Sequence, residues 1–423
     1  MDLFKEYEWR GTIHGATEQI AQVLARDKLV AYAGFDPTAA SLHVGSLLPL
    51  MQLARLQRFG HTPIALAGGG TGLVGDPSGK SDERRLLTQD QIDENLIGIK
   101  RQLAQFLDFE VKTNPARLVN NADWLGTITL TNFLRDVGKS FTVNFMMQKE
   151  SVKRRITSEE GISYTDFSYM LMQAYDFLVL YETHNCTLQV GGSDQWGNMT
   201  LGIDLIRKKH ATTAHAIVFP LITNSDGSKF GKTEAGTVWL DANMTSPYRF
   251  YQWLLNTDDR DAIDRLNYLT WLSQDEIAAL QAELTSAPEK RSAQRALARE
   301  VTTIVHGESE LRKAEKASQV LFGGEIEGLG KQDVLDIFED VPTTEIPRSE
   351  MAGDGMLAVD LAAASGIVKS KGEAKRMIQA GGVYVNNRRV GGIEECISVS
   401  HAIEDEILVL RKGKKQYLVV RLI

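Results

Sequence analysis

The sequence predicts an α/β fold in which a mainly parallel sheet is followed by an α-helical segment and a small α+β module. Short apolar runs that indicate buried strands alternate with stretches of helical periodicity in the first half of the chain. Glycine-rich or polar loops follow several of these runs, where parallel strands would end. Beyond residue 246 the pattern is helical up to about residue 320, and a basic helix and a hairpin follow near the C-terminus.

Composition places the chain among globular proteins. Its 423 residues predict two to four domains, and 43% hydrophobic with 24% charged residues is typical of a folded, water-soluble protein. The N-terminus is charged, and no apolar run approaches the roughly 18 residues of a membrane span, so we expect a cytoplasmic protein without a membrane partner. The two cysteines form no CxxC pair, which argues against a structural zinc site.

The net charge of −8 is unevenly distributed. Residues 351–423 carry a net charge of +3, which leaves −11 for residues 1–350. This asymmetry indicates a basic C-terminal module on an acidic body. Such a module suits contact with nucleic acid, although solvated charges are common on protein surfaces.

The first elements are an amphipathic helix over residues 17–29 and a buried strand over 30–35. A polar turn then leads into a helix that begins at Leu47 and ends at Gly60. The turn contains His43 and Gly45. Ligands bind at the carboxyl ends of parallel strands, and a helix N-terminus offers free N–H groups to a phosphate. The stretch therefore predicts a nucleotide site.

The segment GFDPTAASLHVGS resembles the signature of class I aminoacyl-tRNA synthetases in its tyrosyl-tRNA synthetase version. His43-Val44-Gly45 matches the first three positions of the His-x-Gly-His motif. Two positions depart from the family: Ala40 stands where an acidic residue is common, and Ser46 stands where a second histidine or an asparagine is expected. The alternative is an ordinary strand-to-helix turn with Ser41 as its cap.

A second buried strand, residues 62–67, leads into GGGTGLVGDPSGKSDER. This loop contains a dinucleotide-type glycine pattern and, one residue short, a phosphate-loop pattern. Neither reading is favoured, because the turn from Asp76 to Gly79 stands where a helix would have to begin. In tyrosyl-tRNA synthetases a similar GDPSGK segment closes over the amino acid and ATP, which implies that Asp76 faces the substrate ammonium.

Thr88 and Gln91 predict a capping box at the start of a long helix. The polar group from Asn120 to Trp124 follows a short strand and either lines the site rim or makes turns. Residues 129–156 are predicted helical. Their apolar middle, residues 141–147, is either a dimer surface or ordinary core.

The next helix, residues 165–181, carries a polar stripe. Tyr169, Gln173 and Asp176 fall within about 60° on one face, whereas the other faces are apolar. Buried polar groups require a partner, so the stripe faces either a ligand or an internal hydrogen-bond network. We favour the ligand.

A buried strand over 187–191 runs into GGSDQWGN, which resembles the ribose-binding segment of tyrosyl-tRNA synthetases. Arg207 and Lys208 end the following helix, where they either complement the helix dipole or meet a tRNA acceptor stem. A strand over 217–222 leads to a loop that we expect to be mobile and cationic, with Phe230 as its apolar anchor. Lys-Phe-Gly-Lys-Thr there resembles the class I Lys-Met-Ser-Lys-Ser loop.

Helix starts are predicted at Ser246-Pro247 and at the Ser273/Glu276 capping box. Glycines and prolines indicate a linker before residue 350. Residues 356–390 resemble an S4 RNA-binding motif, whose lysines and arginines would neutralise RNA phosphates rather than read bases.

The expected domain order follows from these patterns. It comprises a Rossmann-like catalytic domain (1–222) with a helical insertion (about 125–185), the mobile loop region (223–245), a helical anticodon-arm domain (246–322), a linker (323–350) and an S4-like domain (351–423).

The resemblance implies a tyrosine-tRNA ligase that uses L-tyrosine, ATP and tRNA(Tyr), acts as a homodimer and holds no tightly bound cofactor or metal. Mg²⁺ is expected to arrive with ATP. The residues implied in catalysis are Thr38, His43, Lys80, Arg84, Lys229, Lys232 and Thr233. Those implied in tyrosine binding are Tyr32, Asp76, Tyr169, Gln173, Asp176 and Gln189. Those implied in ATP binding are Gly34, Asp36, His43, Gly45, Ser46, Gly191, Gly192, Asp194, Gln195 and Lys232. Those implied in tRNA binding are Arg207, Lys208, Lys371, Lys375, Arg376, Arg388 and Arg389.

Two alternatives remain open at this point. A tryptophan-specific relative is disfavoured by the set of Tyr32, Gln173 and Asp176. A synthetase-like RNA-binding protein without activity is suggested only by Ala40 and Ser46.

Overall fold

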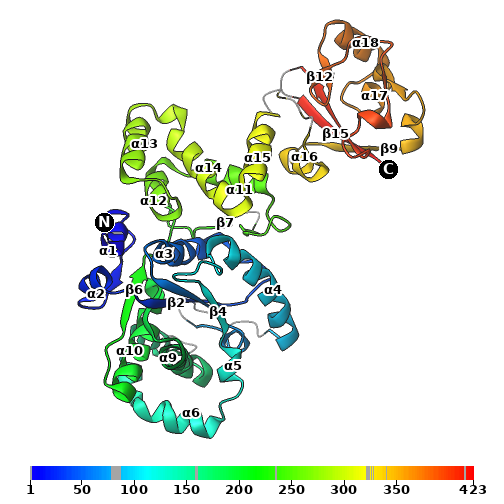
Figure 1. Ribbon diagram of the computed structural model, residues 1–423. Coiled ribbons are helices and arrows are strands. Elements are labelled where there is room, and N and C mark those ends of the chain that lie inside the picture. Colours follow the sequence, from blue (N-terminus) through cyan, green and yellow to red (C-terminus); the bar gives the residue numbers. More distant parts are fainter. Residues whose placement is uncertain are drawn as a thin grey trace. The chain divides into compact units, whose positions relative to one another are not determined.

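The computed structural model describes residues 2–77, 87–157, 161–233, 236–320, 324, 326, 328–339, 341–413 and 416–423 (Figure 1). The chain divides into two compact units. Unit 1 comprises Met1–Met244 and Thr257–Leu297, and unit 2 comprises Thr245–Asn256 and Ala298–Ile423. Within the described ranges, none of the helices has the length and apolar character that a membrane crossing requires.

Unit 1 is built on a six-stranded sheet with the order β1-β6-β5-β2-β3-β4. Its strands are β1 (Gly15–Ala16), β2 (Val30–Phe35), β3 (Thr62–Ala67), β4 (Arg117–Asn120), β5 (Cys186–Gly192) and β6 (His215–Phe219). All pairs are parallel except β1 with β6. The chain leaves β2 toward β3 on one side and returns to β5 on the other, so the strand order reverses beside β2. The predicted α/β class with a parallel sheet is confirmed.

Helices cover both faces of this sheet (Figure 1). Ile64 and Leu66 of β3 pack in one cluster with residues of α9 (Tyr164–His184) and α10 (Trp196–His210), whereas Ala67 packs with Ile92 and Leu96 of α4 (Gln89–Phe106). Successive strand residues point to opposite faces, so α4 and α9 lie on opposite sides of the sheet. Apolar residues on both faces explain why the strands appear in the sequence as continuous hydrophobic runs.

Several helices of unit 1 begin where the sequence predicts. The capping box of Thr88 with Gln91 is present at the start of α4, and that of Ser273 with Glu276 at the start of α13. The larger helices of unit 1 are α1 (Leu3–Trp9), α2 (Ile20–Arg26), α3 (Leu47–Arg58), α4 (Gln89–Phe106), α9 (Tyr164–His184), α10 (Trp196–His210), α12 (Asp259–Leu269) and α13 (Gln274–Ser286). Helix α14 (Ser292–His306) continues from unit 1 into unit 2.

The helical character predicted for residues 129–156 is confirmed, and the segment is divided into α6 (Leu130–Asp136), α7 (Val143–Met147) and α8 (Glu150–Ile156). Thr129 and Thr142 each cap a new helix with their hydroxyl groups, which divides the segment. The strand predicted over 217–222 is shifted to His215–Phe219, since Pro220 has no N–H for the ladder.

Unit 2 combines several helices with a five-stranded sheet of order β12-β11-β14-β15-β9. The helices outside the S4-like region are α11 (Pro247–Leu255), α15 (Glu308–Val320) and α16 (Lys331–Ile337), and α17 (Ala358–Ala364) and α18 (Lys371–Gln379) lie within it. The strands are β9 (Thr343–Ile346), β11 (Val383–Val385), β12 (Arg388–Arg389), β14 (Ile407–Lys412) and β15 (Gln416–Leu422). A separate pair joins β10 (Met356–Leu357) to β13 (Cys396–Ile397).

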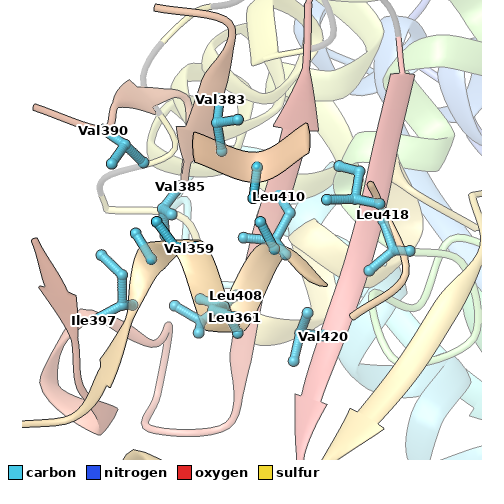
Figure 2. Close-up of a cluster of buried hydrophobic side chains, with 14 of the residues drawn as sticks. Val359, Leu361, Val383, Val385, Val390, Ile397, Leu408, Leu410, Leu418 and Val420 are labelled. Atoms are coloured by element: carbon cyan, nitrogen blue, oxygen red, sulfur yellow. The ribbon is translucent and has the colours of Figure 1, made fainter. Parts of the chain in front are cut away.

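The sheet of unit 2 is buried on both faces. Figure 2 shows Val359 and Leu361 of α17 among the strand residues Leu408, Leu410 and Val420. The alternate strand residues pack on the other face, in a cluster with residues of α11, α15 and α16. That cluster includes Tyr248, Ala317, Val320, Val334, Ile337, Val409 and Val419. The region expected as a linker therefore contains α16 and β9, and both contribute to the core of unit 2.

Candidate active site

A cavity of about 290 Å³ opens in unit 1 at the carboxyl ends of β2, β3, β5 and β6. It lies beside the point where the strand order reverses, the position at which open α/β sheets bind ligands. The predicted residues that line it are Tyr32, Gly34, Asp36, Gly45, Asp76, Tyr169, Gln173, Asp176, Gln189, Gly191, Gly192, Asp194 and Gln195. Most of the predicted tyrosine and ATP residues are thus brought to one place.

Two polar atoms at this cavity have no partner among the described residues. Tyr32 of β2 and Gln189 of β5 are paired across the sheet, and both side chains are buried. The Tyr32 hydroxyl and the Gln189 amide oxygen make no hydrogen bond within the part of the chain that the structure describes. Buried polar groups rarely remain unpaired in folded proteins. These two atoms therefore point to a polar group of a ligand.

Asp176 lies at the same end of the cavity and is 2% exposed. Its Oδ2 accepts a hydrogen bond from Nδ2 of Asn121 at 3.0 Å, and its Oδ1 accepts one from Nε1 of Trp124 at 2.7 Å. Burial raises the pKa of this carboxyl to about 7, although the two donors and their hydrogen bonds act in the opposite direction. Each oxygen keeps acceptor capacity for a further donor.

The polar stripe of α9 faces the cavity as predicted, because Tyr169, Gln173 and Asp176 all line it. Burial raises the pKa of Tyr169, and the nearby carboxylates of Asp36 and Asp76 raise it further. This region is consequently negative. A ligand with an ammonium group is favoured here over an anion.

The chain after β5 forms a part of the cavity wall and is hydrogen-bonded to α9. Gln195 donates through Nε2 to Oδ2 of Asp76 at 2.8 Å, and Asn198 donates through Nδ2 to Oε1 of Gln173 at 2.9 Å. Burial raises the pKa of Asp194, and the charge of Asp76 adds to that rise. A Cβ on Gly192 would lie 2.5 Å from Oδ1 of Asp194, so only glycine leaves this carboxylate its position.

The signature turn is held by two neighbouring segments. Ser41 is not a helix cap as in the alternative reading, because its hydroxyl accepts from Nε2 of Gln102 on α4 at 2.8 Å and from the N–H of Asp241 at 3.1 Å. His43 forms an isolated β-bridge with Trp239. This bridge joins the signature turn directly to the chain that follows the Lys-Phe-Gly-Lys-Thr loop.

Within the turn, Nδ1 of His43 accepts a hydrogen bond from the N–H of Gly45 at 3.0 Å. His43 and Thr38 are exposed and do not line the cavity, and neither does Ser46 at the start of α3. Ser46 makes no side-chain cap to the helix. Of these residues only Gly45 reaches the cavity, so the others belong to its outer rim.

Positive charge is absent from the described lining of the cavity, which holds four carboxylates and neither lysine nor arginine. Lys229 and Lys232 are exposed on the loop outside it. Lys80 and Arg84 lie outside the described residues, and the structure gives no side-chain information for Thr233. A triphosphate at this site would need cations from such loops or from a metal ion that it brings. Among the described residues, no cluster of His, Cys, Asp and Glu is placed to hold a metal.

The predicted tRNA residues are all exposed, on two surfaces that belong to different units. In unit 1, Arg207 pairs with Asp204 at 3.0 Å, and Nζ of Lys208 donates to the carbonyl oxygen of Ser140 at 2.7 Å. In unit 2 they lie on α18 and on the β11–β12 hairpin. These are Lys371, Lys375, Arg376, Arg388 and Arg389.

Sequence reasoning did not assign Asn121, Thr71 or Asn198 to the site. Asn121 connects three segments, since its Oδ1 accepts from the N–H of Gly70 at 2.8 Å while its Nδ2 donates to Thr71 and Asp176. The only signal was its position in a polar group after a predicted strand. That pattern indicates a rim residue or a turn equally well.

Comparisons with known proteins agree on one family. The family described as tRNA synthetases class I (W and Y) matches residues 24–323, and the tyrosine-tRNA ligase C-terminal domain matches residues 333–420. The tyrosine-tRNA ligase of Roseiflexus castenholzii is 53% identical over 421 residues, with 100% of this chain and 99% of that protein covered. The one from Geobacillus kaustophilus is 50% identical over 424 residues, with 100% of both chains covered.

Solved structures agree with this over about three quarters of the chain. A C-terminally truncated mitochondrial tyrosyl-tRNA synthetase from Aspergillus nidulans has a TM-score of 0.69 at 30% identity, with 76% of this chain and 94% of that one covered. A tyrosyl-tRNA synthetase from Archaeoglobus fulgidus, solved with L-tyrosine, has a TM-score of 0.54 at 16% identity and covers 74% of this chain and 99% of its own. The latter similarity concerns the fold alone.

Proposed function

The chain belongs to the tyrosine-tRNA ligases of the class I tRNA synthetases, and on that basis we propose that its cavity binds and activates L-tyrosine. The observation that carries this proposal is that the Tyr32 hydroxyl, which has no partner among the described residues, lines the same cavity as the buried carboxyl of Asp176. The phenol of the substrate can donate a hydrogen bond to the Asp176 carboxylate and at the same time accept one from the Tyr32 hydroxyl. Phenylalanine has no group that satisfies either.

The amino end of the substrate lies toward the negative part of the cavity. Asp76, Tyr169 and Gln173 bind the ammonium group, in agreement with the carboxylates around Tyr169. Gln189 offers its unpaired amide oxygen as a further acceptor. This arrangement directs the substrate carboxylate toward the rim, where ATP binds.

ATP occupies the open side of the site. Gly191, Gly192 and Asp194 hold the ribose and adenine, and Gln195 supports them through Asp76. A Cβ on Gly34 would meet no atom within 4 Å, so a glycine there leaves space for the nucleotide. Asp36, Gly45 and Ser46 complete the nucleotide side at the start of α3.

The activation step needs no protein nucleophile or base. The ionised carboxylate of tyrosine attacks the α-phosphorus of ATP, a new C–O–P bond forms, and the bond to the bridging oxygen of the β-phosphate breaks. Pyrophosphate leaves with its electron pair, and tyrosyl-adenylate remains. Catalysis therefore consists of positioning and of charge stabilisation on the pyrophosphate.

That charge stabilisation must come from outside the acidic cavity. Thr38 and His43 of the signature turn, with Lys80, Arg84, Lys229, Lys232 and Thr233 of the two loops, act on the pyrophosphate side. Mg²⁺ enters bound to the phosphates of ATP. In the second step a hydroxyl of the terminal ribose of tRNA(Tyr) attacks the adenylate carbonyl, and AMP leaves.

Partners follow from surfaces away from the cavity. The exposed lysines and arginines on α18 and the β11–β12 hairpin neutralise tRNA phosphates, and Arg207 with Lys208 approaches the acceptor stem. Apolar side chains on α6 and α7 are exposed, with Leu130 at 70% and Val143 at 59%, and a second copy of the chain covers them. We infer a cytoplasmic enzyme, because ATP, tyrosine and tRNA are available together in that compartment.

Charging of tRNA(Tyr) tests this proposal. The purified chain, ATP, Mg²⁺ and tRNA(Tyr) transcript are incubated with labelled tyrosine, phenylalanine or tryptophan, and acid-precipitable label is counted. We expect transfer of tyrosine alone. Transfer of tryptophan would reassign the cavity, and binding of tRNA without transfer of any amino acid would leave an RNA-binding protein.

A further inference from the structure

A buried arginine of α12 contacts the loop that carries Lys229 and Lys232. Arg265 is 5% exposed, and its Nη2 donates to Oδ1 of Asn224 at 2.6 Å, where the loop begins. Its guanidinium carbon lies 4.9 Å from the centre of the Phe230 ring, which stands between the two lysines in the chain. One side chain thus contacts the loop on both sides of its turn.

On the first side, Asn224 shapes the turn. Its N–H donates to the carbonyl oxygen of Ser228 at 2.9 Å, and its Nδ2 donates to the Ser228 hydroxyl at 2.7 Å. Thr223 and Lys229 form an antiparallel bridge across the same turn. Because Arg265 holds the amide oxygen of Asn224, the position of Lys229 depends on that bond.

On the second side, Phe230 leads to the signature turn. The next residue, Gly231, has φ +80, and a Cβ there would lie 2.2 Å from Cγ2 of Val44. The carbonyl oxygen of Gly231 accepts from the N–H of Val238 at 2.9 Å, whose own carbonyl accepts from the N–H of Val44 at 3.1 Å. Phe230 is 8% exposed. Its contact with Arg265 therefore influences how Lys232 follows the signature turn.

The residue type suits this task. A buried guanidinium is costly unless it is paired, and Arg265 pairs with Asp261 at 3.0 Å on its own helix and donates to Thr257 at 3.3 Å. The oxygen of Asp261 that pairs with Arg265, Oδ2, also accepts a hydrogen bond from the N–H of Ser225 at 3.2 Å. A planar guanidinium serves several partners while one face lies on an aromatic ring, which the point charge of lysine does not do.

We propose that Arg265 is a positioning residue for the ATP half of the reaction, because its hold on Asn224 and Phe230 sets where Lys229 and Lys232 lie. The inference rests on the proposed function, in which these lysines act on the pyrophosphate side. Arg265 itself contacts no substrate. Its removal should therefore affect the ATP step and leave tyrosine binding unchanged.

The first experiment measures adenylate formation in a single turnover as a function of ATP, together with tyrosine affinity by equilibrium dialysis. Arg265→Met should lower the apparent kcat/KM for ATP roughly 10- to 100-fold, the size of a lost hydrogen bond to a charged group. The Kd for tyrosine should change less than about twofold. Arg265→Lys should restore little of the loss.

Arg10→Met is the matched control. Arg10 is 3% exposed and donates to the carbonyl oxygens of Asn267 and Leu272 beside the other end of α12, without a hydrogen bond to the described residues of the loop. Its removal should lower stability toward urea but leave the ATP dependence unchanged. An equal loss of kcat/KM for ATP in both variants would show that Arg265 acts only through the stability of α12, and would overturn the proposal.

A double-mutant cycle separates positioning from general damage. In a Lys229→Ala/Lys232→Ala background, Arg265→Met should have less than about a twofold further effect, because the lysines through which it acts are gone. An undiminished loss there would overturn the proposal. If Arg265→Met does not fold, Asn224→Ala replaces it in the double-mutant cycle. The same two results then support or overturn the proposal. If the unaltered enzyme forms no adenylate, the proposed function itself is refuted.

Discussion

Nε1 of Trp124 lies 2.7 Å from Oδ1 of Asp176, and this contact joins the chain after β4 to the polar face of α9. Asn121 holds the other oxygen of the carboxyl group. The two donors, Asn121 and Trp124, lie close together in the chain. Because each of them holds one oxygen of Asp176, the carboxyl group cannot rotate freely. This acceptor in the cavity is thus oriented before any substrate enters, which reduces the ordering required on binding.

Asp176→Ala should reduce tyrosine affinity and selectivity while ATP binding is retained. The substrate phenol would then lack an acceptor in a buried site, at a cost of about 1–3 kcal/mol, or roughly a 5- to 150-fold loss of affinity. Tyrosine and phenylalanine affinities are measured side by side, with ATP affinity as the control. An equal loss for tyrosine and ATP would contradict the role assigned to this carboxyl.

The buried carboxyl also makes stability depend on pH. Its folded pKa of about 7 lies above the ordinary 3.8, so the folded form binds the proton more tightly, and this stabilisation is lost as the pH rises from about 4 through 7. The free energy of unfolding of the original chain relative to Asp176→Asn should fall by up to roughly 4 kcal/mol over that range. Urea titrations of both proteins between pH 4 and 8 measure it. A difference that stays constant with pH would rule out the raised pKa.

Gly45→Ala should impair activation without affecting tyrosine binding. The new Cβ would lie 2.7 Å from Cε1 and 2.8 Å from Nδ1 of His43, so the imidazole must move away from the N–H group that it accepts from. We expect adenylate formation to slow roughly 100- to 1,000-fold, as for other losses of transition-state donors. Gly138→Ala is the control, because its Cβ meets only an ordinary contact at 3.6 Å. Unchanged rates in Gly45→Ala would remove His43 from the reaction.

The exposed apolar side chains of α6 and α7 should mediate self-association. Leu130→Glu with Val143→Glu places two charges where a second copy would exclude water, and we expect dissociation into monomers. Sedimentation equilibrium of the variant and of the original chain measures this. Ile97→Glu on α4, where the side chain is 63% exposed, is the matched control and should leave the association state unchanged. A dimer that survives the double substitution would place the interface elsewhere.

Much of the site follows from local sequence. The strand β5 and the glycines after it, the helix α9 and the shared face of Tyr169, Gln173 and Asp176 all depend on periodicity and on residues close in the chain. The helix periodicity alone places that stripe on one side. The apolar residues on the other faces of α9 indicate that the helix is buried, so the polar stripe must face either a polar partner or a cavity.

The partners of these residues could not be predicted. Asn121 and Trp124 precede Asp176 by 55 and 52 residues, and Gln102 follows Ser41 by 61. No local pattern specifies which of several polar residues meets another at such a separation. The hydrogen bond from Arg265 to Asn224, which are 41 residues apart, could not be predicted for the same reason.

Unit 2 shows the same limit for apolar residues. Strands β14 and β15 are buried on both faces, so their sequences contain apolar runs and give no sign of which helix covers which face. The helix α16 and strand β9 lie in a stretch punctuated by glycine and proline. Strand β9 joins the sheet by a parallel pairing with β15, and α16 packs in a cluster with α11 and α15, neither of which local sequence encodes.

Tyrosine-dependent exchange of labelled pyrophosphate into ATP tests the central claim most directly, because it requires amino acid and ATP but no tRNA. We predict exchange with tyrosine and none above background with phenylalanine or tryptophan, with a loss of that preference in Asp176→Ala. Exchange with none of the three by a protein shown to be folded would contradict the account, and Ser46→His would then be the first substitution to restore the family signature.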